Sequence, residues 1–234
     1  MTPNAAPLTP NGLFITGTDT GVGKTLVACA LLHAFAALGK RVIGMKPVAA
    51  GAQLNNGVWI NDDVAQLIAA SNVSAPRDAV NPYCFEPPIA PHIAAEIQNK
   101  IIKNNILCES YRRLSALADI VIVEGAGGFC VPFNDQESSA DLARELALPV
   151  VLVVGMRLGC LNHALLTAEA IRSRGLTLAG WVANHIDPGM AHTTANVEAL
   201  QQRLAAPLLA RIAFSDTPDA AAIAPRINLR HLSA

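Results

Sequence analysis

A glycine-rich segment near the start of the chain has the residue types and spacing of a phosphate-binding loop. It runs Gly17-Thr-Asp-Thr-Gly-Val-Gly-Lys-Thr25. Glycines let backbone N–H groups turn towards phosphate oxygens, and a helix beginning here adds partial positive charge. Lys24 would reach the terminal phosphates, and the Thr25 hydroxyl would bind Mg²⁺. The segment therefore predicts a site for a nucleoside triphosphate with magnesium.

One position departs from the strict form of this pattern. The pattern has a glycine where this chain has Thr18, and the glycine stands one residue earlier, at Gly17. The alternative is a chance glycine-rich turn that opens a helix. A short apolar strand at 13–15 and a helical pattern at 24–38 flank the segment, and this order favours the phosphate loop.

An acid and a lysine follow two other predicted strands. Glu124 ends the apolar run 119–123 and precedes several glycines, so it is a candidate second Mg²⁺ ligand. The alternative is an ordinary surface glutamate at a strand-ending turn. Lys46 follows the strand 41–45, where it could hold negative charge on a reacting group. The alternative is an ordinary exposed lysine.

Asp63 is a third candidate oxygen ligand. It lies near the start of a predicted helix, 62–70, that follows the second strand. An acid in a first helical turn also interacts favourably with the helix dipole, so position alone leaves both interpretations open.

The elements that position these residues alternate between strand and helix. Strands are predicted at 13–15, 41–45, 119–123, 149–154, 176–183 and 207–212, and helices at 24–38, 62–70, 109–117, 162–174 and 190–204. This order predicts an α/β P-loop NTPase fold, a mostly parallel, doubly wound sheet with helices on both faces. Ligands bind such sheets at the carboxyl ends of the strands, where each motif falls. The Pro-rich stretch 75–91 is expected to be a functional loop.

Composition limits the classes of protein that fit. The 234 residues are 52% hydrophobic and 15% charged with a net charge of −1, which favours a buried core and gives no basic footprint for nucleic acid. No apolar run approaches the ~20 residues of a membrane span. The five cysteines form no CxxC pair, which fits reduced thiols in the cytoplasm. We expect a disordered tail at 1–11 and one P-loop domain at 12–234.

Seven ordered segments together resemble one family, the dethiobiotin synthetases. They cover nearly the whole chain: 16–25, 46–49, 81–83, 91–92, 123–128, 159–163 and 179–184. The resemblance implies an ATP-dependent cyclo-ligase that carboxylates 7,8-diaminononanoate with CO₂ (from bicarbonate) and closes a ureido ring. A carbamate and a carbamic-phosphoric anhydride are the implied intermediates, and dethiobiotin, ADP and phosphate are the products.

The resemblance also implies roles for particular residues. Lys46 and Lys24 would be catalytic, and Thr25, Asp63 and Glu124 would hold Mg²⁺. The implied ATP-binding residues are Gly21, Val22, Gly23, Lys24, Thr25, Leu26, Asp63, Glu124, Gly125, Ala126, Gly127, Asn184 and His185. The implied substrate-binding residues are Thr20, Lys46, Ala50, Gly159, Cys160, Leu161 and Asn162.

The segment from Gly159 to Asn162 begins a predicted helix, whose N–H groups suit the substrate carboxylate. The family implies that this segment comes from the neighbouring subunit, so we expect a homodimer. Two features depart from the family: Ala50 stands where some relatives have a serine, and 212–215 lacks the usual Pro-aromatic-Leu order. Tyr83 and His92 could shape the diamine pocket, with no mechanism indicated for either.

Three other classes of protein fit the sequence less well. Chromosome-partitioning and division-site ATPase switches have a lysine where this chain has Asp19, and they remain the main alternative. GTP-dependent regulators need Asn-Lys-x-Asp, whereas 184–187 has His185 in place of the lysine. Glutamine-dependent amidotransferases of the cobyrinate type need a further domain with a nucleophilic cysteine.

Overall fold

The computed structural model describes residues 12–55 and 57–232, so the predicted tail at 1–11 lies outside the described part. A six-stranded sheet forms its centre, with all neighbouring strands parallel. In spatial order the strands are β10 (Leu208–Ile212), β9 (Leu178–His185), β8 (Val150–Met156), β1 (Gly12–Gly17), β7 (Ile120–Glu124) and β2 (Val42–Met45). Because the chain leaves β1 to build strands on both sides, the carboxyl end of β1 is the expected ligand crevice.

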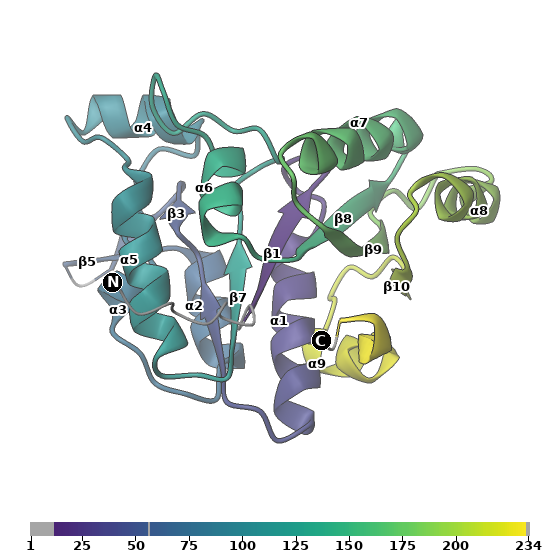
Figure 1. Cartoon of the computed structure of the whole chain (residues 1–234), viewed down its shortest axis with the longest axis horizontal. Helices are drawn as coiled ribbons and strands as arrows, with labels where there is room; N and C mark the ends of the chain where they lie inside the picture. Colours follow the sequence, from purple (N-terminus) through teal and green to yellow (C-terminus); the bar gives the residue numbers. More distant parts are fainter. Residues whose placement is uncertain (1–11, 56, 233–234) are drawn as a thin grey trace, which may run out of the picture.

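Helices cover both faces of the sheet (Figure 1). One face is covered by α1 (Lys24–Ala37), α2 (Asp62–Ala70) and the carboxyl-terminal α9 (Ala220–Ile223). The other face is covered by α5 (Asn104–Ser115), α6 (Ser139–Leu146), α7 (Cys160–Ser173) and α8 (Thr193–Arg203). The strand residues alternate accordingly: Leu152 of β8 joins one core cluster, while its neighbours Val151 and Val153 join the other. This period of two is the expected result of burial on both faces. The predicted fold class is confirmed.

Smaller elements surround the carboxyl ends of β2 and β7. They are β3 (Val48–Ala49), paired with β6 (Tyr83–Cys84), the β4–β5 hairpin (Gln53–Asn55 and Val58–Ile60), α3 (Arg77–Val80) and α4 (Pro91–Ile97). Two short 3₁₀ turns, η1 (Ala224–Arg226) and η2 (Leu229–His231), follow α9.

Two expectations need correction, and one helix of the core was missed. The stretch 75–91 is not wholly irregular, because α3 and β6 lie within it. The helix expected at 109–117 begins earlier, at Asn104. Helix α6 was not predicted; it begins with a capping box between Ser138 and Asp141.

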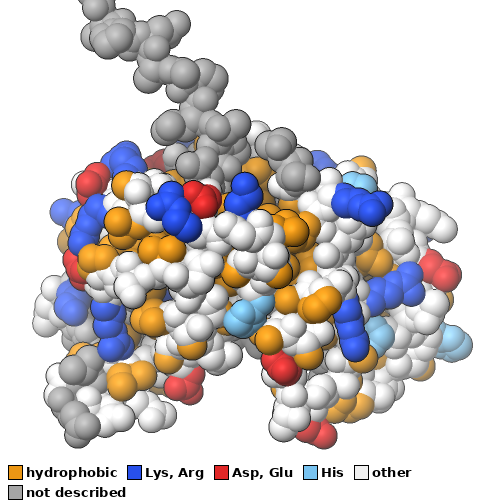
Figure 2. Space-filling model, turned by 90° about the horizontal axis from the view of Figure 1, so that it is seen from below, with side chains coloured by type: hydrophobic (Ala, Val, Ile, Leu, Met, Phe, Trp, Pro, Cys, Tyr) orange, Lys and Arg blue, Asp and Glu red, His pale blue; other side chains and the backbone are white. Residues whose placement is uncertain are grey.

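The face of the molecule seen from below has Lys and Arg side chains spread among hydrophobic and polar ones (Figure 2). Among the described helices, none is long and apolar enough to cross a bilayer.

Candidate functional site

The glycine-rich segment connects β1 to α1, as a phosphate loop requires. Gly21 and Gly23 have φ values of 74° and 89°, in the left-handed region that favours glycine. A Cβ on Gly23 would lie 2.3 Å from the Asn184 side-chain nitrogen, so the close approach of β9 also requires glycine there. Within the described residues, helix α1 has no side-chain N-cap, which leaves its first N–H groups available to an anion.

The departure at Gly17 and Thr18 has a local explanation. A Cβ on Gly17 would lie 2.6 Å from a methyl group of Val22, so the loop needs its glycine at this position. Thr18 in turn bonds to β8: its N–H donates to the Val153 carbonyl (3.0 Å), and its hydroxyl accepts from the Gly155 N–H (3.4 Å). The loop is therefore fastened to the neighbouring strand.

Lys24 and Thr25 begin α1 and point into the molecule. The Lys24 Nζ donates to the Asp19 carbonyl (2.9 Å), and the Thr25 hydroxyl donates to Glu124 Oε1 (2.9 Å). Burial, and next the positive charge of Lys46, lower the pKa of Lys24 to about 8. Leu26, the last predicted loop residue, is half-buried against the α1 side of the core.

Lys46 lies at the centre of the site. Its Nζ is 2.8 Å from Asp63 Oδ2 and 2.5 Å from Glu124 Oε1, and its side chain is only 6% exposed. Burial alone would lower the pKa of Lys46, but the charges of Glu124 and Asp63 outweigh it and the pKa is raised. Burial likewise raises the pKa of Asp63, and Lys46 reverses this, so the Asp63 pKa is lowered. Three residues from the ends of β2 and β7 and the start of α2 thus meet in two ion pairs that share Lys46.

Glu124 has unused binding capacity. One of its oxygens accepts from both Thr25 and Lys46, whereas Oε2 is buried and has no hydrogen-bond partner among the described residues. A buried carboxylate oxygen without a partner is costly, so this atom is a natural site for a bound cation or donor.

A cavity of about 580 Å³ opens beside these charges. Its lining includes Asp19 and Thr20 of the phosphate loop, Lys46, Asp63 and Ala50, together with segments 88–91 and 126–128. The predicted residues Ala126 and Gly127 therefore border this cavity, while Gly125 is buried and its N–H donates to the Ile15 carbonyl (2.9 Å). The predicted diamine residues Thr20, Lys46 and Ala50 are brought together here.

Other predicted residues lie outside this cavity lining. The Asn184 amide is buried and donates to the Val22 carbonyl (2.8 Å), so it supports the phosphate loop from behind. His185 is half-buried, and burial and the charge of Arg211 lower its pKa. The segment Gly159 to Asn162 begins α7, with Gly159 at φ 93° and Cys160 buried; in the described part of the chain, this segment does not line the cavity.

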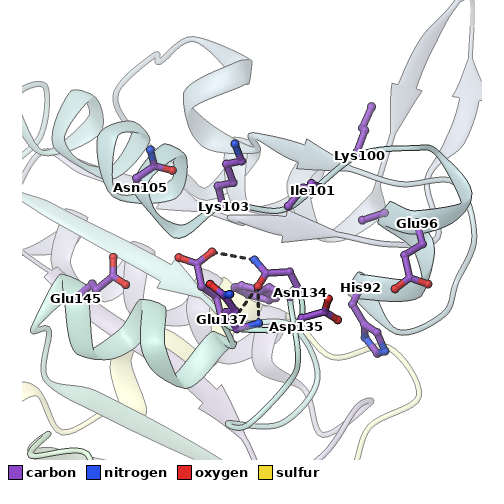
Figure 3. Close-up of a pocket in the computed structure, with 13 residues that line it drawn as sticks. His92, Glu96, Lys100, Ile101, Lys103, Asn105, Asn134, Asp135, Glu137 and Glu145 are labelled. Atoms are coloured by element: carbon purple, nitrogen blue, oxygen red, sulfur yellow. Dashed lines mark hydrogen bonds between the residues drawn. The ribbon is translucent and has the colours of Figure 1, made fainter.

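A second cavity, of about 560 Å³, lies between α4, the segment before α5 and the 134–137 turn (Figure 3). Lys100, Ile101 and Lys103 border one side, and Asn134 and Glu137 the other. His92 lines this cavity and not the first one, as far as the described residues show. The Tyr83 hydroxyl accepts from the Lys103 N–H (3.2 Å), which gives Tyr83 a structural contact.

Sequence reasoning missed one pair of residues in the site. Asp19 was noted only for differing from a switch lysine, and Arg157 was not considered. The structure joins them by an ion pair between the phosphate loop and the β8–α7 loop. Pairing between residues so far apart in sequence leaves no periodic pattern, so no sequence signal identified it.

A family model and two sequence relatives each match most of the chain. A family model described as an AAA domain matches residues 11–221. An ATP-dependent dethiobiotin synthetase BioD from Aromatoleum aromaticum is 54% identical over 220 residues, which cover 94% of this chain and 98% of that protein. The protein of the same name from Nitrosospira multiformis is 56% identical over 221 residues, with 94% and 96% covered.

Solved structures show a similar fold at much lower identity. The MinC:MinD cell division complex from Aquifex aeolicus matches with a TM-score of 0.53 and 18% identity, covering 88% of this chain and 82% of that one. MinD from Pyrococcus horikoshii, complexed with Mg-ADP, matches with a TM-score of 0.50 and 19% identity, covering 86% and 80%. At this identity the likeness concerns the fold alone. The two sequence relatives, by contrast, span nearly the whole chain at more than half identity, and the chain therefore belongs to the ATP-dependent dethiobiotin synthetase family.

Proposed function

We propose that the cavity beside Lys46 is the site where this chain converts 7,8-diaminononanoate into dethiobiotin. As a member of its family the chain is an ATP-dependent dethiobiotin synthetase. The observation that most supports this placement is the buried Lys46, which lies between Asp63 and Glu124 at the wall of a cavity that the phosphate loop also borders.

The reaction brings negative charges together. One amine of the substrate forms a C–N bond with CO₂, giving a carbamate and releasing a proton. A carbamate oxygen then attacks the γ-phosphorus of ATP, and ADP leaves. The second amine attacks the carbonyl carbon of this anhydride, phosphate leaves with the C–O electron pair, and the ureido ring closes with loss of a proton. Carbamate and triphosphate repel each other, so the site must supply fixed positive charge.

Lys46 and Lys24 are the proposed sources of that charge. Lys46 is paired with two carboxylates, and Lys24 donates to a backbone carbonyl of its own loop. Both ammonium groups therefore start within the site, and reacting anions would replace partners that these lysines already hold. Lys46 is assigned to the carbamate and Lys24 to the ATP phosphates.

Mg²⁺ is the proposed cofactor, with Thr25, Asp63 and Glu124 as its protein ligands. The residues fit this ion: they offer a hydroxyl and two carboxylates, and Glu124 Oε2 is a buried oxygen without a partner among the described residues. When bound, Mg²⁺ would neutralise phosphate charge and polarise the transferred phosphoryl group. The predicted loop residues Gly21–Leu26 would hold the phosphates, and Asn184 and His185 are proposed to lie near the nucleotide base.

A homodimer is also part of the proposal. The N–H groups at the start of α7, from Gly159 to Asn162, do not border the cavity of their own chain within the described residues, yet they suit a carboxylate. A second copy could present them to the tail of the substrate. A cytoplasmic location completes the proposal, and it is supported by all five cysteines being free thiols.

The direct test is to incubate the chain with 7,8-diaminononanoate, bicarbonate and MgATP and to measure dethiobiotin by mass spectrometry. The same assay on Lys46→Ala should show product reduced about 100-fold or more, because the variant lacks a charge that faces the reacting anions. Exposed Lys40, just beyond the far end of α1, provides the matched control, Lys40→Ala.

Each result has a definite meaning. Product that requires all three substrates and is lost only in Lys46→Ala would support both the reaction site and the lysine's role. Product at the normal rate in Lys46→Ala would remove Lys46 from the mechanism. ATP hydrolysis that ignores the diamine, without dethiobiotin, would contradict the proposal and favour a molecular switch.

A further inference from the structure

An ion pair joins the phosphate loop to the end of β8, and neither of its residues has a role in the proposed reaction. The Arg157 guanidinium donates to Asp19 Oδ2. Arg157 follows β8 directly, and Asp19 lies in the loop after β1. The hydrogen bonds of Thr18 to Val153 and Gly155 of β8 lie next to this pair, so the phosphate loop is held to β8 at Thr18 and to the residue after β8 at Asp19.

Asp19 is held at three separate atoms. Its Oδ1 accepts from the Thr20 N–H (2.7 Å), its Oδ2 accepts from Arg157, and its carbonyl accepts from the Lys24 Nζ (2.9 Å). The first of these bonds, with Arg157 and the nearby His163 acting further, lowers the pKa of Asp19. A movement of Asp19 would therefore shift both the loop backbone and the lysine that the phosphates need.

The other end of the ion pair also has a functional neighbour. Arg157 is followed by Leu158 and then by Gly159, where the proposed carboxylate-binding segment begins. Asp19 in turn lines the cavity with Lys46 and Asp63. The pair thus lies between the loop that would bind ATP and the α7 N-terminus that would bind the substrate tail.

We propose that Arg157 is a positioning residue, which acts through Asp19 to hold the phosphate loop in the conformation that binds ATP. The inference rests on the proposed placement of ATP and adds a residue outside its assigned ligands. The pair is not expected to matter for stability, because both side chains are about half exposed and such pairs contribute little to the free energy of unfolding. Its expected effect is on the position of the loop backbone and Lys24, and therefore on the contacts that bind the ATP phosphates.

The test is a double-substitution cycle with Arg157→Gln, Asp19→Asn and the double variant, together with Arg157→Lys. For each protein the Kd of MgATP is measured by calorimetry, and the KM for ATP and kcat are measured by dethiobiotin formation. Arg112→Gln is the control, because Arg112 forms a more exposed ion pair with Glu109 (2.9 Å) on α5, away from the loop. Thermal unfolding of every variant checks that the fold is retained.

We expect Arg157→Gln to raise the Kd of MgATP and the KM for ATP by about 5- to 20-fold, with kcat changed less than about threefold. Asp19→Asn should do the same, and the double variant should be no worse than the worse single variant, because both remove one interaction. Arg157→Lys should recover most of the affinity. Arg112→Gln should match the starting protein.

Three results would overturn the proposal: an unchanged Kd in Arg157→Gln, multiplicative losses in the double variant, or no recovery in Arg157→Lys. The calorimetric Kd of MgATP tests the positioning role of Arg157 separately from the proposed function. If the starting protein binds MgATP but forms no dethiobiotin, the function fails while the cycle still decides the role of Arg157. If the starting protein does not bind MgATP, the positioning role is excluded with it.

Discussion

At the scale of single residues, the site contains a buried lysine, Lys46, whose burial is not explained by a gain in stability. Removing Lys46 and its carboxylates from water is expensive, and buried ion pairs are often no more stabilising than apolar residues of the same volume. Lys46 is nevertheless held by Asp63 and Glu124 with almost no exposure. Such an arrangement is more consistent with ligand chemistry than with structural support.

Glu124 allows the metal assignment to be tested. Glu124→Gln keeps the size of the side chain but removes the charge from its buried oxygens, so we expect the Mg²⁺ concentration for half-maximal activity to rise by about 10-fold or more. The measurement is dethiobiotin formation against free Mg²⁺ at constant ATP. Glu109→Gln, on the exposed face of α5, should leave the curve unchanged. An unaltered Mg²⁺ dependence in Glu124→Gln would exclude this residue as a ligand.

At the scale of elements, the two helices that begin at the proposed anion sites, α1 and α7, start in the same way. Helices α1 and α7 both follow a left-handed glycine, Gly23 or Gly159, and neither has a side-chain cap from the described residues. Helices α2 and α6 are capped by Asn61 and Ser138. The uncapped N–H groups of α1 and α7 remain available, which is what phosphate and carboxylate ligands need.

The cap of α6 should affect stability without affecting the reaction. Ser138 accepts from the Asp141 N–H (3.3 Å), and the Asp141 carboxylate accepts from the Ser138 N–H (3.0 Å). Ser138→Ala should therefore lower the free energy of unfolding by about 1 kcal/mol, measured by urea denaturation, with kcat and the KM for ATP unchanged. Ser115→Ala, at the exposed end of α5, should have a much smaller effect. Equal losses in both variants would show that the capping box is not the cause.

The core strands could be predicted from the sequence, whereas the short elements near the cavity could not. The six core strands were predicted because each contains a short, mostly buried apolar run, and the positions of Lys46 and Glu124 at strand ends followed from them. The short elements near the cavity were not predicted, since long-range bonds fix them: the Lys46 N–H donates to the Val80 carbonyl (2.9 Å), and the Tyr83 N–H to the Pro47 carbonyl (3.2 Å). The ion pair between the phosphate loop and the β8–α7 loop was missed for the same reason.

At the scale of the whole molecule, the surface near the site has features expected of an interface between copies. Leu158, just before α7, is 95% exposed, and Leu166 on the same helix is also exposed. Near the cavity, Ile89, Ile93 and Ile97 are exposed on and before α4. In the proposed homodimer, a second subunit would cover these exposed apolar residues.

Mixed dimers can test whether α7 serves the partner's site. Lys46→Ala disables the cavity, and Gly159→Asp places a negative charge where the substrate carboxylate should bind. A side chain at Gly159 has room, because no described atom lies within 4 Å of an added Cβ, but the left-handed φ of 93° strains it. Gly159→Asn carries the same strain without the negative charge and is therefore the control. We expect Gly159→Asp to raise the KM for the diamine about 10-fold or more and Gly159→Asn to raise it far less.

If each site uses the cavity of one subunit and α7 of the other, a dimer of Lys46→Ala with Gly159→Asp has one site with both defects and one with neither. Random exchange makes about half of the dimers mixed, so an equal mixture should recover about a quarter of the normal activity at low diamine concentration. The measurement is dethiobiotin formation after the two variants are unfolded and refolded together. If α7 serves its own subunit, every site in every dimer has one defect, and mixing should restore nothing.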